Sequence, residues 1–431
     1  MRRKSPNMRW FILAALLASP AAATDVYIGI DSSKDSRPQW NLGIDAFTAK
    51  EPKSREDAEL ARTVREVIRA DLLFSRYFEL KEERPPAGAS KSEARRFWKT
   101  RGSTYLLKAE ASRVAESAVV KVTLIDLDAD ATLLSRHYRH KNSKWRALAH
   151  RASDDIVRQL TGRQGIASTQ IVFVSNRTGD KELFVMDYDG GNTSQLTRNK
   201  SINLFPRWRP DGKALAFTSY KDGNPDIFLY DLSRGKITPL IDRQGLNIPG
   251  GFSHDGTKLA ATVSRGKNPN IFLIDVKTRK AESVTSHYGV DSSPTFSPDG
   301  ESLAFVSDRA GNPQIHIIEL ATGRTRRLTH LNWCDSPSWS PTGEWVAFAG
   351  RAHRKDPLDI FLIDNAGTRT IQITHGEGSN ESPSWSPDGR FLIFTSTRDG
   401  RRRLYRMDAD GSAPHALGNA PASSFSPNWG T

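Results

Sequence analysis

Residues 296–307 read FSPDGESLAFVS, and this pattern decides the fold. An aromatic residue stands two positions before a Pro-Asp-Gly turn, and a short apolar run follows the turn. Proline presets φ, aspartate suits turn geometry, and glycine adopts positive φ. The stretch therefore predicts a strand, a tight turn and a second strand.

The same pattern recurs through the C-terminal part of the chain. Its aromatic residues are Trp208, Phe252, Phe296, Trp339, Trp385 and Phe425, the last before Pro427 and Asn428. Their spacings are 44, 44, 43, 46 and 40 residues. A further apolar run ending in an acid and a fourth short strand complete each unit. Four strands every ~40–45 residues are typical of a propeller blade. We therefore predict an all-β six-bladed β-propeller with WD40-like repeats over residues 169–431.

The two ends of this region predict how the ring closes. The first unit begins at Ile171–Ser175, which already corresponds to a second strand. The last unit ends with a spare first strand at Ser423–Pro427. We therefore expect the C-terminal strand to complete the first blade and lock the ring, because one sheet edge would be left open without it.

The first 23 residues have the pattern of a secretory signal peptide. A basic stretch, Met1–Arg9, precedes the apolar run Trp10–Ala18 and the small residues Ala21–Ala23. The apolar run is shorter than the ~20 residues that span a bilayer. No cysteine follows in a lipidation position, so we expect an exported, soluble protein; translation begins at Met1 or at Met8.

Charge and cysteine content argue against a nucleic-acid-binding protein and against a disulfide-stabilised one. The net charge of +13 falls to +9 without residues 1–23. The charges are scattered, and no basic stripe alternates with aromatic residues as in nucleic-acid-binding proteins. Cys334 is the only cysteine, so no intrachain disulfide forms and a small buried residue is expected.

Residues 24–161 predict a small α/β N-terminal domain, and residues 162–168 a linker. Its helices are expected at Ser54–Phe74 and Trp145–Thr161, and a loop at Glu82–Ser92. Its strands are expected at Val26–Ile30, Ile44–Phe47, Thr104–Ala111, Ala118–Asp126 and Leu133–Tyr138.

The chain contains no convincing catalytic or metal motif. Gly251–Asp255 fails the last position of a G-x-S-x-G nucleophile elbow, and H-E-x-x-H and Walker patterns are absent. Asp187–Gly190 and Asp408–Gly411 partly match calcium loops, but both occupy expected hairpin turns. We predict a non-enzymatic protein without cofactor or metal.

In a propeller, the loops that enter the innermost strands surround the mouth of the central channel. These loops hold Leu204, Leu246, Asn247, Asp291, Ser292, Asn332, Asp335, Glu381 and Ser382. Several are acidic or carry an amide, which favours negative potential and a basic or amide-rich partner. The alternative is that these side chains only cap the loops.

The repeat turns resemble those of the TolB family of the Tol–Pal system. Residues 145–162 are similar to the segment before the propeller in that family, and residues 26–38 resemble its N-terminal box. The N-terminal match is more specific than the repeat. Departures are His254 in place of a turn proline and the arginine-rich turn Arg401–Arg403.

The resemblance implies a periplasmic scaffold of a Gram-negative envelope, acting as a monomer. Such proteins bind the lipoprotein Pal at the propeller mouth and offer the N-terminal box to TolA of the inner membrane. They support outer-membrane integrity and constriction in cell division, and Pal biases the box between ordered and free states. The box would comprise Asp25, Val26, Tyr27, Ile28, Ile30, Asp31, Ser32 and Arg37.

Two other functions stay open. One is a periplasmic propeller that binds a small ligand or polysaccharide in its channel. The other is an unrecognised hydrolase that depends on Ser253 or His254.

Overall fold

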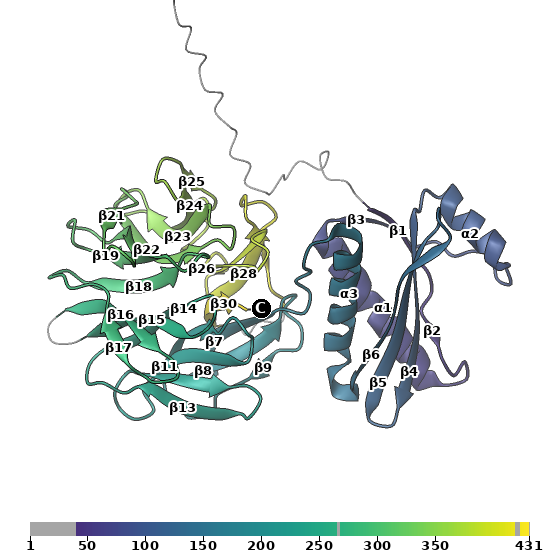
Figure 1. The fold of residues 1–431 in the computed structure, drawn as a ribbon, viewed down its shortest axis with the longest axis horizontal. Coiled ribbons are helices and arrows are strands. Elements are labelled where there is room, and N and C mark those ends of the chain that lie inside the picture. Colours follow the sequence, from purple (N-terminus) through teal and green to yellow (C-terminus); the bar gives the residue numbers. More distant parts are fainter. Residues whose placement is uncertain (1–39, 265–267, 419–422, 431) are drawn as a thin grey trace, which may run out of the picture.

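The computed structural model describes residues 40–264, 268–418 and 423–430 (Figure 1). A small α/β part comes first and a ring of six four-stranded sheets follows. In Figure 1 the two parts lie side by side, and helices α1 and α3 face the propeller. This arrangement confirms the predicted fold class.

The N-terminal part is a mixed sheet covered by helices. The strand order is β3-β1-β4-β5-β6, with β2 beside β4, and β1 runs parallel to both β3 and β4. The strands are β1 (Trp40–Ile44), β2 (Thr48–Ala49), β3 (Phe78–Lys81), β4 (Tyr105–Val114), β5 (Ser117–Asp126) and β6 (Ala131–Lys141). The helices are α1 (Arg55–Ser75), α2 (Lys91–Thr100), the 3-10 turn η1 (Asn142–Lys144) and α3 (Trp145–Thr161).

Helices α1 and α3 pack together on one face of this sheet. Their apolar residues, including Val64 and Ile156, are fully buried against Leu42 of β1 and Val120 of β5. The amphipathic spacing that predicted both helices is the pattern that this one-sided burial requires. Ser54 caps the start of α1 by accepting a hydrogen bond from the backbone of Asp57.

Two predictions in this part were wrong. The strand expected at Ile44–Phe47 is β1, which ends where that prediction began. The loop expected to extend to Ser92 ends at Ser90, because Ser90 and Glu93 form a capping box that begins α2. Helix α2 inserts Trp98 against Gly43 on the other face of the sheet, where a Cβ would lie 2.6 Å from the indole.

The propeller consists of six antiparallel blades. Blade 1 has the order β30-β7-β8-β9, and blades 2 to 6 use β10–β13, β14–β17, β18–β21, β22–β25 and β26–β29. The first five sets of strands are β7 (Gln170–Thr178), β8 (Asp180–Asp187), β9 (Ser194–Gln195); β10 (Asn203–Trp208), β11 (Ala214–Ser219), β12 (Asp226–Asp231), β13 (Lys236–Ile241); β14 (Asn247–Phe252), β15 (Lys258–Ser264), β16 (Pro269–Asp275), β17 (Ala281–Ser283); β18 (Asp291–Phe296), β19 (Ser302–Ser307), β20 (Gln314–Glu319), β21 (Thr325–Arg327); β22 (Trp333–Trp339), β23 (Trp345–Arg351), β24 (Asp359–Asp364) and β25 (Thr370–Gln372). The last strands are β26 (Asn380–Trp385), β27 (Phe391–Ser396), β28 (Arg403–Asp408), β29 (His415–Ala416) and β30 (Ser424–Trp429).

Strand β30 closes the ring as predicted. It pairs antiparallel with β7, and Trp429 lies opposite Ile171. The indole of Trp429 also donates a hydrogen bond of 2.8 Å to the Thr169 hydroxyl. The last strand therefore supplies the edge that the first blade lacks.

The sixth repeat is shifted from the predicted register. Trp429, not Phe425, occupies the aromatic position of this strand, because it pairs with the second strand as Trp208 does in blade 2. Phe425 instead corresponds to Leu204. The irregular spacing of 40 residues resulted from the wrong aromatic residue being chosen, since Trp385 and Trp429 lie 44 positions apart.

Each innermost strand has a bulge at the same place. The register with the second strand shifts between Leu204 and Arg207 in blade 2, and at equivalent points in the other five blades. A residue at the bulge has positive φ in five blades: Phe205, Ser293, Ser336, Ser382 and Ser426. A bulge bends the strand and redirects its side chains, and here it turns several of them toward the channel.

Candidate functional site

The two ends of the propeller differ in what they carry. One end, here called the mouth face, holds the loops that enter each innermost strand and the loops between the second and third strands. The other end, the turn face, holds the Pro-Asp-Gly turns and the turns between the third and fourth strands. Antiparallel strand order places these two sets of loops at opposite ends.

Equivalent residues at or next to the start of the innermost strands are buried. All six have no exposed surface: Asn203, Asn247, Asp291, Cys334, Asn380 and Ser424. Asn247 donates to the carbonyl oxygens of Arg243 and Pro225. Asp291 accepts two hydrogen bonds of 2.9 Å from Arg309. Asn247 and Asp291, which we expected at the surface of the mouth, therefore hold the loops in place beneath it.

The other residues expected at the mouth are partly exposed. They are Leu204, Leu246, Ser292, Asn332, Asp335, Glu381 and Ser382. Glu381 lies 3.8 Å from Arg402 and accepts a hydrogen bond from Ser379. Asp335 forms no ion pair within the described ranges; burial, together with the nearby Glu381 carboxylate, raises its pKa. The raised pKa disfavours the charged form of Asp335, so the negative potential expected at the mouth stays a prediction.

Cations around the mouth were missed in the sequence. Each lies two positions after a serine at or near the end of the second strand: Arg177, Lys221, Arg309 and Arg398. In all four, the backbone N–H donates to that serine hydroxyl at 3.3 Å. Each cation lies over an aromatic ring of its own blade, at 4.4 to 6.0 Å from the centroid. The repeated Ser-x-Arg/Lys pattern could have predicted these cations from the sequence.

Large apolar side chains are also exposed on the mouth face. Tyr288 is 78 % exposed, and Ile202, Val290 and Tyr220 are 36–40 % exposed. Ile202, Tyr288 and Val290 precede innermost strands, and Tyr220 lies between the second and third strands of blade 2. These residues lie in two groups, on blades 2 and 4, and exposed apolar groups beside a channel are candidates for an interaction surface.

The channel itself is a cavity of about 500 Å³. Leu246, Val290 and Ser292 line it near the mouth, and Pro298 and Pro341 line it near the turn face. Its volume lies within the range of small-molecule pockets.

The N-terminal part packs on the turn face. Phe74 of α1 lies 4.4 Å from the ring of Phe391 and 4.9 Å from Tyr188, and the Arg406 guanidinium covers it at 3.9 Å. Arg76 forms an ion pair with Asp408. The mouth face is thus left free of the described N-terminal residues.

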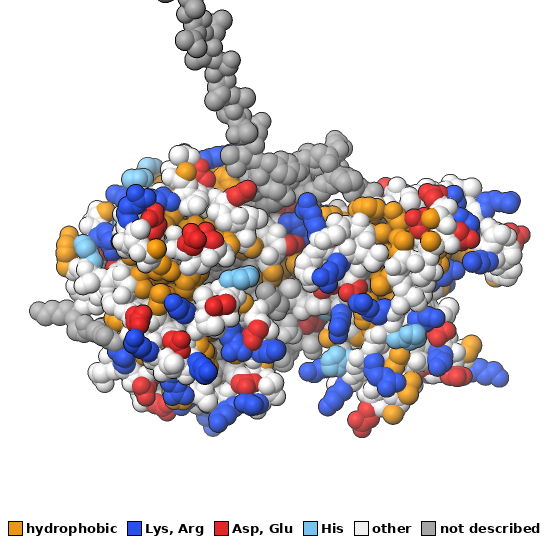
Figure 2. All heavy atoms as spheres, viewed as in Figure 1, with side chains coloured by type: hydrophobic (Ala, Val, Ile, Leu, Met, Phe, Trp, Pro, Cys, Tyr) orange, Lys and Arg blue, Asp and Glu red, His pale blue; other side chains and the backbone are white. Residues whose placement is uncertain are grey.

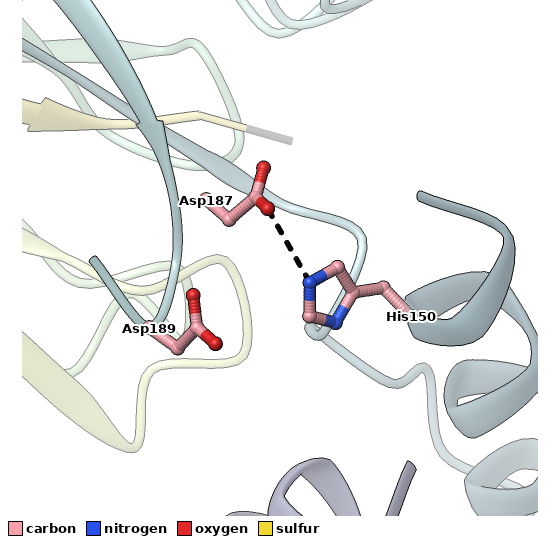
Figure 3. Close-up of side chains that lie close together, drawn as sticks. All are labelled: His150, Asp187 and Asp189. Carbon is pink, nitrogen blue, oxygen red and sulfur yellow. Dashed lines mark ion pairs between the residues drawn. The ribbon is translucent and has the colours of Figure 1, made fainter. Parts of the chain in front are cut away.

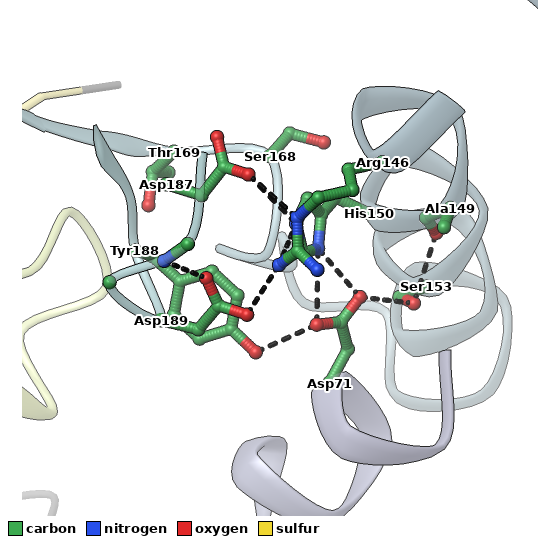
Figure 4. A network of polar contacts seen from close by, with 12 residues as sticks. Asp71, Arg146, Ala149, His150, Ser153, Ser168, Thr169, Asp187, Tyr188 and Asp189 are labelled. Atoms are coloured by element: carbon green, nitrogen blue, oxygen red, sulfur yellow. Dashed lines mark hydrogen bonds and ion pairs between the residues drawn. The ribbon is translucent and has the colours of Figure 1, made fainter. Parts of the chain in front are cut away.

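A buried polar network joins the same two parts (Figure 4). Asp71 of α1 accepts hydrogen bonds from His150 at 2.9 Å, Ser153 at 2.7 Å and Tyr188 at 2.8 Å. Burial opposes protonation of His150, yet its hydrogen bonds to Asp187 and Asp71 raise the pKa to about 9. His150 is therefore a cation held between two carboxylates at neutral pH.

His150, Asp187 and Asp189 also lie close enough together to suggest a metal site (Figure 3). Arg146, however, contacts both carboxylates, Asp187 at 3.1 Å and Asp189 at 2.6 Å. The guanidinium already supplies the positive charge that a metal ion would bring. This turn, which partly matches a calcium loop, therefore serves in domain packing.

Charges are mixed on the face of the protein seen in Figure 2, where basic and acidic side chains alternate without a stretch of one sign. This distribution agrees with the scattered charges in the sequence. Among the described residues, no helix is both long and apolar enough to cross a membrane. All eight residues expected to form the N-terminal box lie outside the described residues.

A family model described as the TolB beta propeller domain matches residues 157–334 and 331–431. The chain belongs to this family. The Tol-Pal system protein TolB of Geobacter sulfurreducens is 37 % identical to the chain over 214 residues, which cover 47 % of the chain and 48 % of that relative. A Tol-Pal system protein TolB of Geobacter metallireducens is 35 % identical over 161 residues, or 36 % of the chain and 38 % of the relative. The chain thus matches about half or less of the length of these TolB relatives.

The structural comparison extends further along the chain. The crystal structure of TolB from Acinetobacter baumannii superimposes with a TM-score of 0.74 at 26 % identity. The match covers 91 % of this chain and 96 % of that one. The likeness to TolB therefore includes the N-terminal part as well as the propeller.

Proposed function

We propose that this protein is a non-enzymatic interaction scaffold of the Tol–Pal system in the periplasm. It would link the lipoprotein Pal at the outer membrane to the TolA complex of the inner membrane, and so support envelope integrity and constriction during division. Membership of the TolB propeller family and the printed names of its relatives support this role. Export from the cytoplasm follows from the signal-like pattern of residues 1–23.

The observation that carries the proposal is the set of exposed apolar side chains on the mouth face. Tyr288 and Val290, which lead into blade 4, and Ile202 and Tyr220 of blade 2 present large side chains to water beside the channel. Protein interfaces are enriched in aromatic residues and arginine, and their rims are polar. We assign this surface to the docking of Pal.

Most cations of the rim are paired with carboxylates of this chain. Arg309 pairs with Asp291 at 2.9 Å, and Arg398 pairs with Glu377 at 2.7 Å. These ion pairs neutralise much of the positive charge of the rim, so the cations do not favour an acidic partner. The Pal surface that we propose to dock here therefore stays one with basic or amide groups around an apolar centre.

A pull-down from host envelope extract tests this assignment. The wild-type protein should recover a Pal-like lipoprotein, and Tyr288→Ser should lose most of it, because the most exposed apolar side chain is removed. Leu73→Ser is the matched control, since Leu73 is 42 % exposed on the N-terminal part. Equal recovery by the Tyr288 variant would exclude the mouth face as the docking surface.

The TolA contact is proposed for the N-terminal box. Deletion of residues 24–37 should abolish TolA binding and spare Pal binding. Loss of both would contradict the division of labour between the two ends of the chain. A change of the box between ordered and free states on Pal binding additionally requires that Pal bind one state more tightly.

The channel of about 500 Å³ supports the second candidate, a propeller that binds a small ligand or polysaccharide. Stabilisation against heat by cell-wall fragments, without recovery of a lipoprotein, would favour it. The two functions are separable, because one uses the rim and the other the interior.

A further inference from the structure

One level of the channel is lined by equivalent residues of the six blades. Each lies one position before the conserved aromatic residue and pairs at an equivalent place with its second strand. They are Arg207, Gly251, Thr295, Ser338, Ser384 and Asn428, and all six line the cavity. Arg207 is the one charged side chain of this ring.

The guanidinium of Arg207 is anchored but not neutralised. Its Nε donates to the carbonyl oxygen of Gly250 at 2.6 Å, and its Nη1 donates to that of Pro206 at 3.0 Å. Across the described ranges, Arg207 has no carboxylate within 4.0 Å, and its Nη2 has no acceptor. Because a guanidinium has five N–H donors in a rigid fork, an unused pair of donors remains.

The side chain of Arg207 is half-buried among the groups that line the channel. Desolvation there lowers the pKa of Arg207 to about 10, and no nearby acid offsets it. The side chain still carries its charge at neutral pH. A charge that is shielded from water is tolerated best when an opposite charge and further hydrogen bonds accompany it.

The opposite wall offers hydroxyl groups and space. Asn428 and Ser384 are occupied by links between blades, because Asn428 accepts from the backbone of Trp208 and Ser384 accepts from that of Trp429. Within the part of the chain that the structure describes, the hydroxyls of Thr295 and Ser338 have no hydrogen-bond partner. Gly251 adds no side chain beside Arg207, which leaves room in the ring.

We propose that the channel binds a small oxyanion, a carboxylate or a phosphate, with Arg207 as its main ligand. The planar fork of Arg207 suits two oxygen atoms at once. Thr295 and Ser338 donate hydrogen bonds from the same level of the channel. The site is separate from the docking surface proposed above and does not depend on it.

Isothermal titration calorimetry of the full chain tests the site. Sodium phosphate and sodium acetate are titrated separately, with the ionic strength held constant by sodium chloride. At least one anion should bind at a single saturable site, and the comparison shows whether phosphate or carboxylate is preferred. Absence of saturable binding of both would overturn the proposal.

Matched variants locate the binding. Arg207→Met should weaken binding at least about tenfold, because the charged hydrogen bonds are lost. Arg209→Met is the control, since Arg209 lies two positions along the chain, paired with Asp211 in an exposed turn. Equal binding by the Arg207 and Arg209 variants would place the anion elsewhere and overturn the assignment.

Thermal unfolding provides a second readout. In chloride buffer Arg207→Met should melt close to the wild-type temperature, because the half-buried charge that it removes has no ion-pair partner among the described residues. The bound anion should raise the melting temperature of the wild type and of Arg209→Met only. If Arg207→Met does not fold, Arg207→Lys replaces it, and the loss of the fork should still weaken binding.

Discussion

Asp71 joins the two parts of the molecule through a single carboxylate. It sits in α1, is 3 % exposed, and receives donors from both α3 and the first blade. Each donor is itself buried, so the whole group is shielded from water. A network of this kind is stable only while every member is paired.

Asp71→Asn should therefore destabilise the protein strongly. The change leaves the His150 cation with Asp187 alone, and removing one member of a buried ion pair costs about 3–5 kcal/mol. Urea unfolding at pH 7 measures the loss. Asp128→Asn is the control, because Asp128 forms only an exposed pair with Lys99 and should change stability by about 0.5 kcal/mol or less. Equal losses in the two variants would contradict the role of Asp71.

The raised pKa of His150 predicts that stability falls in alkaline solution. The pKa is about 9 in the folded protein and roughly 6.5 in the unfolded chain, so the stabilisation is complete below pH 6.5. It is lost as the pH rises through 9, with a total of roughly 3 kcal/mol. Urea unfolding between pH 6 and 9.5 should show this fall in the wild type and not in His150→Gln. Parallel pH profiles of the two proteins would contradict it.

Some residue roles could be predicted from the sequence and others could not. The aromatic residue before each Pro-Asp-Gly-like turn recurs at a nearly fixed spacing that does not depend on how the loops fold. Five of the six were therefore identified correctly. Asn247 and Asp291 were expected at the surface, but both are buried, because Asn247 donates to carbonyl oxygens of a neighbouring loop and Asp291 accepts from Arg309. Arg207 was overlooked because its isolation depends on five other strands, which no local pattern reveals.

Among the elements, β30 carries the closure of the propeller. It pairs with β7 and buries Trp429 between the first and last blades. Without it, blade 1 would have three strands, and β7 would become the unpaired inner edge of that blade.

Truncation after Asn419 should destabilise the whole propeller. The melting temperature should fall by on the order of 10 °C, because the innermost strand of blade 1 is lost together with its aromatic residue Trp429. Circular dichroism follows the unfolding, and a synthetic peptide of residues 423–431 should restore part of the loss. An unchanged melting temperature would mean that blade 1 is stable without its inner strand.

The repeating and amphipathic elements were more predictable than the isolated ones. Helices α1 and α3 and strand β30 followed from periodicity and from the missing first strand. Helix α2 was missed because its ten residues are mostly polar and only Trp98 is buried. The capping box of Ser90 and Glu93 could have predicted the start of α2, but Ser90 was interpreted as part of a loop.

At the scale of the whole molecule, the two parts meet on the turn face, and the described N-terminal residues leave the mouth face free. The contact combines Phe74, inserted between Tyr188 and Phe391, with the ion pairs of Arg76 and Arg146. The propeller residues of this contact belong to blades 1 and 6.

Phe74→Ala should loosen the two parts without unfolding either one. The loss of packing is about 2–3 kcal/mol, because the ring is only partly buried. Small-angle scattering should then show a larger radius of gyration. Leu73→Ala is the control, since the neighbouring side chain is 42 % exposed and should change nothing measurable. An unchanged radius in the Phe74 variant would show that the polar contacts alone hold the arrangement.

The central claim is that the mouth face docks the envelope partner, and site-specific photo-crosslinking tests it most directly. A photoreactive residue is placed at Tyr288 in one protein and at Val114, which is 45 % exposed on the N-terminal part, in another. After irradiation in host envelope extract, position 288 should yield an adduct with a Pal-like lipoprotein and position 114 should yield none. The same adduct at position 114, or its absence at position 288, would contradict the account.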